Sequence, residues 1–398
     1  MSKKVAITGM GIISSIGTTV EENYHALLQC KPGISFISNI QTRHEKDIMV
    51  GEIKLTNDEL IKQLKLPVSN NYSRTALLGV LAAKQAVADA KIDNISDCKT
   101  GLISATSVGG MDKTEKYYYD YFTDENPQKY IEGHHGGDAT QKIAKQLGIT
   151  DFVTTISTAC SSSANAIMLG ARLIKSGELD RVIVGGADCL SKFTINGFKT
   201  LMILSDTYCT PFDENRKGLN LGEAAAFLVL ESDEMVKKHD KKVLAYVSGY
   251  GNANDAFHQT ASSENGEGAT LAMQKAFKVA DLLPEQIDYI NAHGTATLNN
   301  DLSESKAILR VFGSQVPDLS STKSYTGHTL AAAAAIEAVY AVLALQHQVV
   351  FPSLNFKTVI KETGIIPVST LKEKKIQHVL SNSFGFGGNC STLIFSKN

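Results

Sequence analysis

A single cysteine stands where a strand pattern gives way to a helix pattern. Phe152–Ile156 is a β-branched run that favours a buried strand, and small and apolar residues recur at helical spacing from Ala164 onwards. Cys160 therefore lies at a strand-to-helix turn, where unpaired backbone N–H groups and the positive end of the helix dipole favour a thiolate. A thiolate at such a turn is a candidate nucleophile. A lone cysteine is also commonly a small buried side chain, and this stretch alone leaves both interpretations open.

Two histidines, a lysine and a glycine-rich segment occupy comparable positions later in the chain. His293 follows the apolar run that begins at Tyr289, Lys323 and His328 lie in the segment Ser321–His328, and glycines surround Phe386 in the segment Asn382–Gly388. If these runs are strands, their ends gather at one edge of a sheet, where ligand chemistry collects in α/β folds. We expect these side chains to share a site with the cysteine.

The second half of the chain repeats the order of patterns in the first. Val243–Gly251 parallels Val5–Gly11, Tyr289–Gly294 parallels the strand at Gly101, Ser321–Lys323 with its helix parallels Ser157–Cys160, and His378–Ser381 parallels Arg181–Val184. Strands alternating with helices predict an α/β protein with two similar halves, residues 1–240 and 241–398, each a mostly parallel sheet covered on both faces. The charged run Glu234–Lys242 is the candidate boundary. The small-residue helices that follow Cys160 and His328 are expected to lie between the two sheets.

Composition excludes several classes of protein. The chain has 398 residues and a net charge of −2, which disfavours a nucleic-acid partner. Its six cysteines form no C-x-x-C pair and no metal spacing with histidine, so we expect no disulfide framework, no metal and a reducing cytoplasm. No uninterrupted apolar run approaches about 18 residues, so we expect neither a membrane span nor secretion. Gly9-Met10-Gly11 lacks the third glycine of a dinucleotide fingerprint, which disfavours nucleotide binding.

The joint pattern, in this order from Val5 to Phe395, resembles the β-ketoacyl-acyl-carrier-protein synthases, the Cys-His-His condensing enzymes of the thiolase-like superfamily. The resemblance implies a five-layered αβαβα fold with two pseudo-symmetric halves. It implies a Claisen condensation without a cofactor, in which Cys160 takes an acyl chain from acyl carrier protein and a malonyl carrier protein loses its carboxylate to give the attacking carbanion. It also implies a homodimer, paired through the strand and helices near the nucleophile.

The resemblance assigns a role to each polar side chain. The backbone N–H groups of Cys160 and Phe386 are implied to stabilise the tetrahedral oxyanion. His293 and His328 are implied to hold the malonyl thioester oxygen as neutral imidazoles while it becomes an enolate. Lys323 is implied to order His328 by its fixed charge.

Several supporting residues accompany this set. Glu337, inside an alanine-rich helix, is the expected partner of Lys323, because a buried unpaired carboxylate is costly. Asp301 matches an acid near the first histidine, and Phe386 matches a movable gate over the acyl pocket. The candidate substrate-binding residues are Thr295, Thr297, Gly385, Gly387, Gly388, Asp255 and His258.

The chain departs from the usual fatty-acid enzymes at several points. Leu298-Asn299-Asn300 precedes Asp301, and Ser161-Ser162-Ser163 follows the cysteine. Asn70, Asn71 and Tyr72 stand where relatives carry basic residues for docking the carrier protein, although Lys62, Lys65 and Arg74 remain nearby. Fatty-acid elongation is the first prediction. Because of these departures, a specialised polyketide or aryl-polyene pathway is the alternative.

Two further classes of function are disfavoured. A noncatalytic chain-length partner subunit would lack the nucleophile, whereas the cysteine and both histidines are present. A thiolase would use a second cysteine near the C-terminus as base, and Cys390 is available, but Gly385–Gly388 follows the synthase pattern. The aromatic segment 111–137 has no clear period, and plain packing is expected there ahead of a pocket cap or a subunit contact.

Overall fold

The computed structural model describes residues 4–124 and 128–397. Ten of its strands form one large sheet. In the order in which they pair, the ten strands are β11 (Asp318–Ser320), β10 (Tyr289–Asn291), β14 (His378–Phe384), β15 (Asn389–Ser396), β9 (Ala245–Asn254), β1 (Val5–Ile13), β8 (Ala224–Ser232), β6 (Arg181–Asp188), β4 (Thr100–Ala105) and β5 (Phe152–Ile156). Short strands form two smaller sheets, β12–β13 (Val349–Val350, Lys372–Glu373) and β2–β3–β7 (Ile34–Phe36, Met49–Gly51, Leu221–Gly222).

The two halves of the large sheet have equivalent strand orders when read outwards from its middle. The order β1-β8-β6-β4-β5 on one side corresponds to β9-β15-β14-β10-β11 on the other. In each half the three outermost strands pair in parallel and the inner pairings are antiparallel. This confirms the predicted repeat of elements. Pairing of β1 with β9 through Ala6 and Tyr246 joins the halves into one sheet, which the sequence did not predict. The division at residue 240 stays a prediction.

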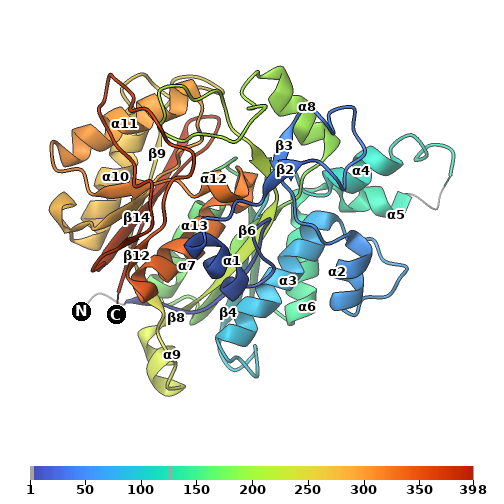
Figure 1. The fold of residues 1–398 in the computed structure, drawn as a ribbon. Coiled ribbons are helices and arrows are strands. Elements are labelled where there is room, and N and C mark those ends of the chain that lie inside the picture. Colours follow the sequence, from blue (N-terminus) through green and yellow to red (C-terminus); the bar gives the residue numbers. More distant parts are fainter. Residues whose placement is uncertain (1–3, 125–127, 398) are drawn as a thin grey trace.

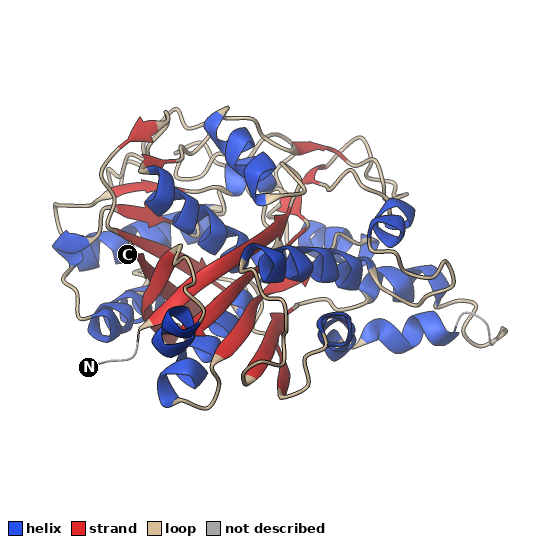
Figure 2. Cartoon of the chain, turned by 90° about the horizontal axis from the view of Figure 1, so that it is seen from below, coloured by secondary structure: helices blue, strands red, loops and turns tan. Residues whose placement is uncertain are grey.

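Helices cover both faces of this sheet in the layers expected for the fold (Figures 1 and 2). Between the halves lie α7 (Ser162–Ser176) and α13 (Ala333–His347), which contact each other and strands of both halves. The outer layers are α3 (Arg74–Asp89) with α6 (Gly136–Leu147), and α10 (Glu267–Ala280) with α11 (Leu298–Phe312). The other helices are α1 (Val20–Leu28), α2 (Asn57–Gln63), α4 (Met111–Tyr117), α5 (Gln128–Ile131), α8 (Lys192–Thr200), α9 (Asp233–Lys238) and α12 (Lys323–Thr326).

Small side chains allow the middle helices to approach the sheet closely. A Cβ at Gly170 in α7 would lie 2.5 Å from a methyl of Val184 in β6. Every α13 residue from Ala333 to Leu345 is buried. Within the described residues, the segment Leu330–His347 is long and apolar enough to cross a membrane, yet 89% of it is buried inside the protein. It is therefore the central core helix of the two halves.

Two expectations about burial are wrong. Strand β5 lies at the edge of the sheet, and all five of its residues are only partly buried, because no strand among the described residues pairs with its outer edge. The aromatic segment does not pack into the core, since Tyr119 is 86% and Phe122 is 78% exposed. Figure 1 shows α4 and α5 in this segment projecting from the body of the molecule.

Candidate active site

Cys160 is held at the tip of the turn between β5 and α7. Ala159 adopts a left-handed conformation (φ 53°), so the chain reverses sharply before the helix begins at Ser162. Ser161 Oγ donates to the carbonyl of Thr158 at 2.7 Å, and Ser162 Oγ accepts the Thr158 N–H at 2.8 Å. The serines that follow the cysteine therefore brace the turn, as the predicted strand-to-helix position requires.

The thiol of Cys160 is neutral at pH 7. Burial raises its pKa to about 11, although Lys323 and the backbone N–H groups of Phe386 and Cys160 act in the opposite direction. The expectation of a thiolate is therefore wrong for the free protein, because burial outweighs the helix terminus and the nearby cation. The same contributions place the Phe386 and Cys160 amides close to the sulfur, as the predicted oxyanion site requires.

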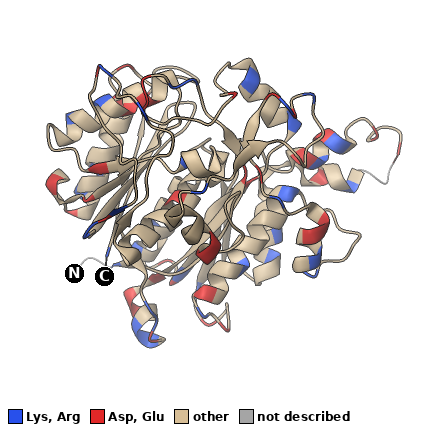
Figure 3. Ribbon diagram, in the orientation of Figure 1, with Lys and Arg blue, Asp and Glu red and all other residues tan. Residues whose placement is uncertain are grey.

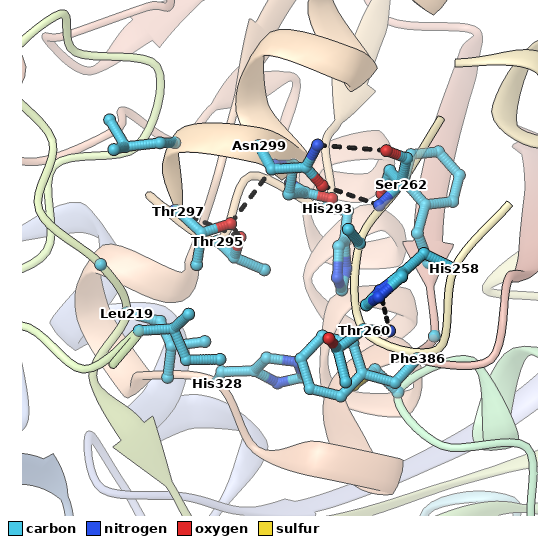
Figure 4. Close-up of a pocket in the computed structure, with 18 of the residues that line it drawn as sticks. Leu219, His258, Thr260, Ser262, His293, Thr295, Thr297, Asn299, His328 and Phe386 are labelled. Carbon is cyan, nitrogen blue, oxygen red and sulfur yellow. Dashed lines mark hydrogen bonds between the residues drawn. The ribbon is translucent and has the colours of Figure 1, made fainter. Parts of the chain in front are cut away.

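His293 and His328 lie together at this site. Their ring centroids are 5.4 Å apart and their planes are nearly perpendicular, at 89° (Figure 4). Burial and then the charge of Lys323 hold the pKa of both imidazoles well below 6.5, so both rings are neutral. Leu330 N–H donates to Nδ1 of His328 at 3.2 Å, which leaves the proton of this ring on Nε2. Among the described residues, Nδ1 of His293 is buried without a hydrogen-bond partner.

The predicted ion pair between Lys323 and Glu337 is confirmed. Lys323 Nζ contacts Glu337 Oε1, and the two side chains are only 3% and 1% exposed. Burial raises the pKa of Glu337, and Lys323 lowers it. The lysine also lies close enough to both histidines and to Cys160 to influence their titration.

Two buried carboxylates of α11 hold the loop that carries His293. Asp301 accepts the N–H groups of Ala296 at 3.1 Å and Phe212 at 2.7 Å, so it binds backbone near His293. Glu304 accepts the N–H groups of His293 at 2.9 Å and Gly294 at 2.8 Å, and burial raises its pKa to about 7. Sequence reasoning missed Glu304. Its spacing of three residues from Asp301 was the available signal, because such residues share a helix face.

The site opens into a cavity of about 240 Å³. Its lining includes Cys160, both histidines and all of the predicted substrate-binding residues, Thr295, Thr297, Gly385, Gly387, Gly388, Asp255 and His258. The two threonine hydroxyls are 3.0 Å apart, and Thr297 caps the start of α11. Asp255 accepts the N–H of Gly268 at 2.7 Å and so ties the mouth loop to α10. His258 is exposed and accepts the N–H of Thr260 at 3.2 Å.

Asn299, two residues before Asp301, contacts the loop at the mouth of the cavity. Asn299 accepts the N–H of Ser262 at 2.7 Å and donates to its carbonyl at 3.1 Å (Figure 4). The Asn299 side chain thereby binds both the N–H and the carbonyl of Ser262 in this loop. The departure Leu298-Asn299-Asn300 noted in the sequence therefore supplies a loop contact.

Phe386 lies in the glycine turn between β14 and β15. Its ring stacks on Phe198 with centroids 5.9 Å apart and planes 20° from parallel. Gly387 and Gly388 have φ angles of 83° and 85°, a region that favours glycine. A Cβ at Gly385 would lie 2.7 Å from the carbonyl of Thr158, so the turn sits directly against the Cys160 segment.

Arg74 is placed differently from expectation, whereas Cys390 agrees with the expectation that no thiolase-type base is present. Arg74 does not serve docking, because it is buried and pairs with Glu223 at 2.7 Å, whereas Lys62 and Lys65 are exposed. Cys390 lines the cavity, but burial, Asp255 and Glu304 raise the pKa of its thiol, which disfavours a basic role. All six cysteines are free. The described residues contain no group of three or more His, Cys, Asp or Glu that could hold a metal.

Comparison with known proteins agrees with this geometry. Residues 2–235 match the family model "Beta-ketoacyl synthase, N-terminal domain", and residues 244–357 match "Beta-ketoacyl synthase, C-terminal domain". The 3-oxoacyl-[acyl-carrier-protein] synthase 2 of Staphylococcus aureus (strain COL) is 33% identical, covering 100% of this chain and 99% of its own.

Solved structures of ketosynthases share the fold over the full chain. The ishigamide ketosynthase/chain length factor is similar with a TM-score of 0.94 at 30% identity, covering 100% of both chains. The AntDE:AntF complex of a type II polyketide acyl-carrier protein with its ketosynthase bound to the hexaketide is similar with a TM-score of 0.86 at 26% identity, again covering 100% of both chains. The chain therefore belongs to the β-ketoacyl synthase family and is an acyltransferase of the 3-oxoacyl-[acyl-carrier-protein] synthase type.

Proposed function

We propose that this protein extends an acyl chain held on Cys160 by decarboxylative Claisen condensation with a malonyl group on acyl carrier protein. The observation that carries the proposal is the meeting of Cys160 with two neutral imidazoles, His293 and His328, in one cavity. A thiol supplies the nucleophile, and paired neutral donors suit an oxygen that gains charge during the reaction. Each half-reaction then uses a different part of the site.

In the first half-reaction the sulfur of Cys160 attacks the acyl thioester. Because the thiol is neutral at pH 7, its proton leaves as the carbon–sulfur bond forms, and Lys323 stabilises the developing thiolate. The amides of Cys160 and Phe386 donate to the tetrahedral oxyanion. The carbon–sulfur bond to the carrier then breaks, and the carrier's thiol leaves with a proton. The acyl chain remains on Cys160.

In the second half-reaction the malonyl thioester loses its carboxylate as carbon dioxide. The electron pair moves onto the thioester oxygen, which becomes an enolate. His293 and His328, both neutral imidazoles, donate hydrogen bonds to this oxygen. The malonyl C2 attacks the acyl carbon, and the sulfur of Cys160 leaves. Glu304 and Asp301 support this step by holding the backbone around His293.

The partner in both half-reactions is acyl carrier protein. Its thioester-bearing arm would enter at the mouth of the cavity, where Met202 is 90% and Leu298 is 64% exposed and Lys217 is also exposed. Along the ribbon in Figure 3, Lys and Arg positions are interspersed with Asp and Glu positions. We therefore expect apolar contacts at this rim to contribute more to docking than a basic patch. Met202→Glu should raise KM for acyl carrier protein, whereas Lys62→Glu should change it less.

The first candidate for the acyl substrate is an acyl chain of fatty-acid elongation. The full-length relatives named as synthase 2 support this candidate. A ketosynthase of a specialised pathway is the second candidate, which the similarity to the ishigamide enzyme favours. Incubating the protein with a panel of acyl carrier proteins, followed by mass spectrometry of Cys160, distinguishes the two. Saturated acyl masses on Cys160 support elongation, and polyunsaturated or keto-bearing masses support the specialised pathway. Acylation that persists in Cys160→Ala contradicts the proposal.

We also propose that the protein is a homodimer and that it works in the cytoplasm, where reducing conditions keep its six thiols free. The free edge of β5 and the exposed aromatic residues Tyr119 and Phe122 are surfaces that a second copy could cover. Sedimentation should show a dimer at micromolar concentration. A stable monomer would contradict this proposal, and a partner of the same fold would then be the next candidate.

A further inference from the structure

One buried carboxylate, Asp188, has no role assigned in the steps above, although its charge raises the pKa of the Cys160 thiol. It is the last residue of β6 and is fully buried. Its Oδ1 accepts the hydroxyl of Thr106 and the N–H groups of Ser107 and Val108, the last two at 3.1 and 3.3 Å. Its Oδ2 accepts the N–H of Ala331 at 2.9 Å and lies 3.0 Å from the Ser107 nitrogen. The carboxylate therefore links the loop after β4 to the turn that follows His328.

Two consecutive amides connect this carboxylate to the imidazole of His328. The N–H of Ala331 points to Asp188, and the N–H of the preceding residue, Leu330, points to Nδ1 of His328. Leu330 has a left-handed φ of 55°, a conformation that an L-residue keeps only when its surroundings hold it. The orientation of the Leu330 amide therefore depends on what anchors the next one.

The backbone and the ring of His328 are held by different groups. His328 N–H donates to the carbonyl of Asn220 at 2.7 Å, and the His328 carbonyl accepts the N–H of Gly222 at 2.9 Å. These contacts fix the main chain but not the ring. The ring accepts a hydrogen bond from Leu330 N–H, and this bond determines which ring nitrogen carries the proton.

The turn after His328 rests directly on β6. A Cβ at Gly186 would lie 3.1 Å from the carbonyl oxygen of Ala331 and 3.0 Å from that of Ala105. The missing side chain allows the turn to sit close to the strand end. At that distance the short side chain of Asp188 reaches both the turn and the loop after β4.

We propose that Asp188 is a positioning residue for His328. It fixes the turn Leu330–Ala332 so that the Leu330 amide holds Nδ1, and the Nε2 proton is left to donate to the enolate oxygen. This inference rests on the proposed role of His328 in the malonyl half-reaction. It predicts that loss of the carboxylate weakens decarboxylation far more than acylation of Cys160.

Asp188→Asn is the informative substitution because it changes one oxygen of a nearly identical shape. If the amide oxygen stays on Ser107 and Val108, the new NH₂ group faces the Ala331 N–H, and two donors then oppose each other. Thr106→Val is the matched control. It removes a hydrogen bond from the opposite oxygen of Asp188, together with the one that Thr106 accepts from Gly109 N–H at 3.1 Å, and leaves the Ala331 contact in place.

The experiment uses the full-length protein and measures two rates for each variant. Carbon dioxide release from malonyl carrier protein reports the His328 step, and radiolabelling of Cys160 by an acyl carrier protein reports the other. We expect Asp188→Asn to lower kcat for decarboxylation by about 10–100-fold, the range seen when a supporting partner is lost. KM for the malonyl carrier should change little. The labelling rate should not fall, because the carboxylate of Asp188 raises the pKa of the Cys160 thiol and its loss favours the thiolate. Thr106→Val should retain most of the decarboxylation.

A spectroscopic readout separates positioning from general loss of structure. In ¹⁵N-histidine-labelled protein, His328 should change from the Nε2–H form towards a tautomeric mixture in Asp188→Asn. Asp188→Glu should decarboxylate faster than Asp188→Asn but more slowly than the wild type. If Asp188→Asn fails to fold, Asp188→Glu carries the same two measurements, and a selective loss of decarboxylation is expected there too.

Three outcomes overturn the inference. These are unchanged decarboxylation with an unchanged tautomer, equal loss of both rates in a folded variant, and equal loss in Thr106→Val. Failure of the proposed function is a separate result, because the wild-type protein would then release no carbon dioxide from malonyl carrier protein at all.

Discussion

The imidazole rings of His293 and His328 are nearly perpendicular, with their centroids 5.4 Å apart, although the two residues belong to different loops. His293 follows β10, and His328 follows α12. One substrate oxygen placed between them could accept a hydrogen bond from each ring. Both rings are neutral because burial and Lys323 oppose their protonation.

The two half-reactions should be separable by substitution. Cys160→Gln should abolish condensation yet leave malonyl decarboxylation, because the histidines remain. His293→Ala should lower decarboxylation by about 10²–10³-fold, the range for loss of one oxyanion donor, and leave labelling of Cys160 measurable. Radiolabelled acylation and carbon dioxide release test both variants. If Cys160→Gln released no carbon dioxide while His293→Ala released it at the wild-type rate, the assigned roles would be wrong.

Phe386 is expected to control the order of the half-reactions. Its ring stacks on Phe198, and flanking glycines tolerate the backbone change that a swing requires. Phe386→Ala should slow acyl transfer to Cys160 or allow malonyl binding before acylation, which stopped-flow kinetics can follow. Phe198→Leu is the matched control, because it alters the stacking partner and leaves the turn intact. Unchanged kinetics and product length in Phe386→Ala would assign this ring to packing.

Alkylation of Cys160 should depend steeply on pH. A thiol with a pKa of about 11 has a thiolate fraction that rises about tenfold per pH unit below that value. The iodoacetamide rate, measured by mass spectrometry of the Cys160 peptide, should therefore rise from pH 6 to 9 without a plateau. Lys323→Met should lower the rate at each pH, because it removes the nearby cation. A plateau below pH 8 would show that the free thiol ionises more readily than its burial indicates.

Breaking the Lys323–Glu337 pair should destabilise the protein more than removing both partners. Lys323→Met leaves a buried carboxylate unpaired, which costs about 3–5 kcal/mol, whereas Lys323→Met with Glu337→Leu removes both charges and should recover much of this loss. Urea unfolding measures the difference. Activity should stay low in the double variant, because His328 and Cys160 still lack the cation. Recovery of both stability and activity would make the pair purely structural.

Much of the site could be predicted because its local patterns depend on neighbouring residues. The turn at Cys160 follows from a β-branched run before it and small residues after it, and the structure places the reversal at Ala159. The repeated order of strands follows in the same way, since each long strand has its own local run of apolar residues. Pairing of Lys323 with Glu337 could be expected because a carboxylate in an alanine-rich helix requires a partner.

Burial and long-range contacts were decided only by the tertiary structure. Cys160 and Arg74 are both enclosed by segments distant in sequence, so the thiol is neutral and the guanidinium is unavailable for docking. The contact from Asp188 to Ala331 spans 143 positions in the chain, and no local pattern contains it. By itself the sequence determined which chemical groups this protein carries and in what order. The packing of the two halves determined their protonation and their neighbours, because both depend on how much water the surrounding chain excludes.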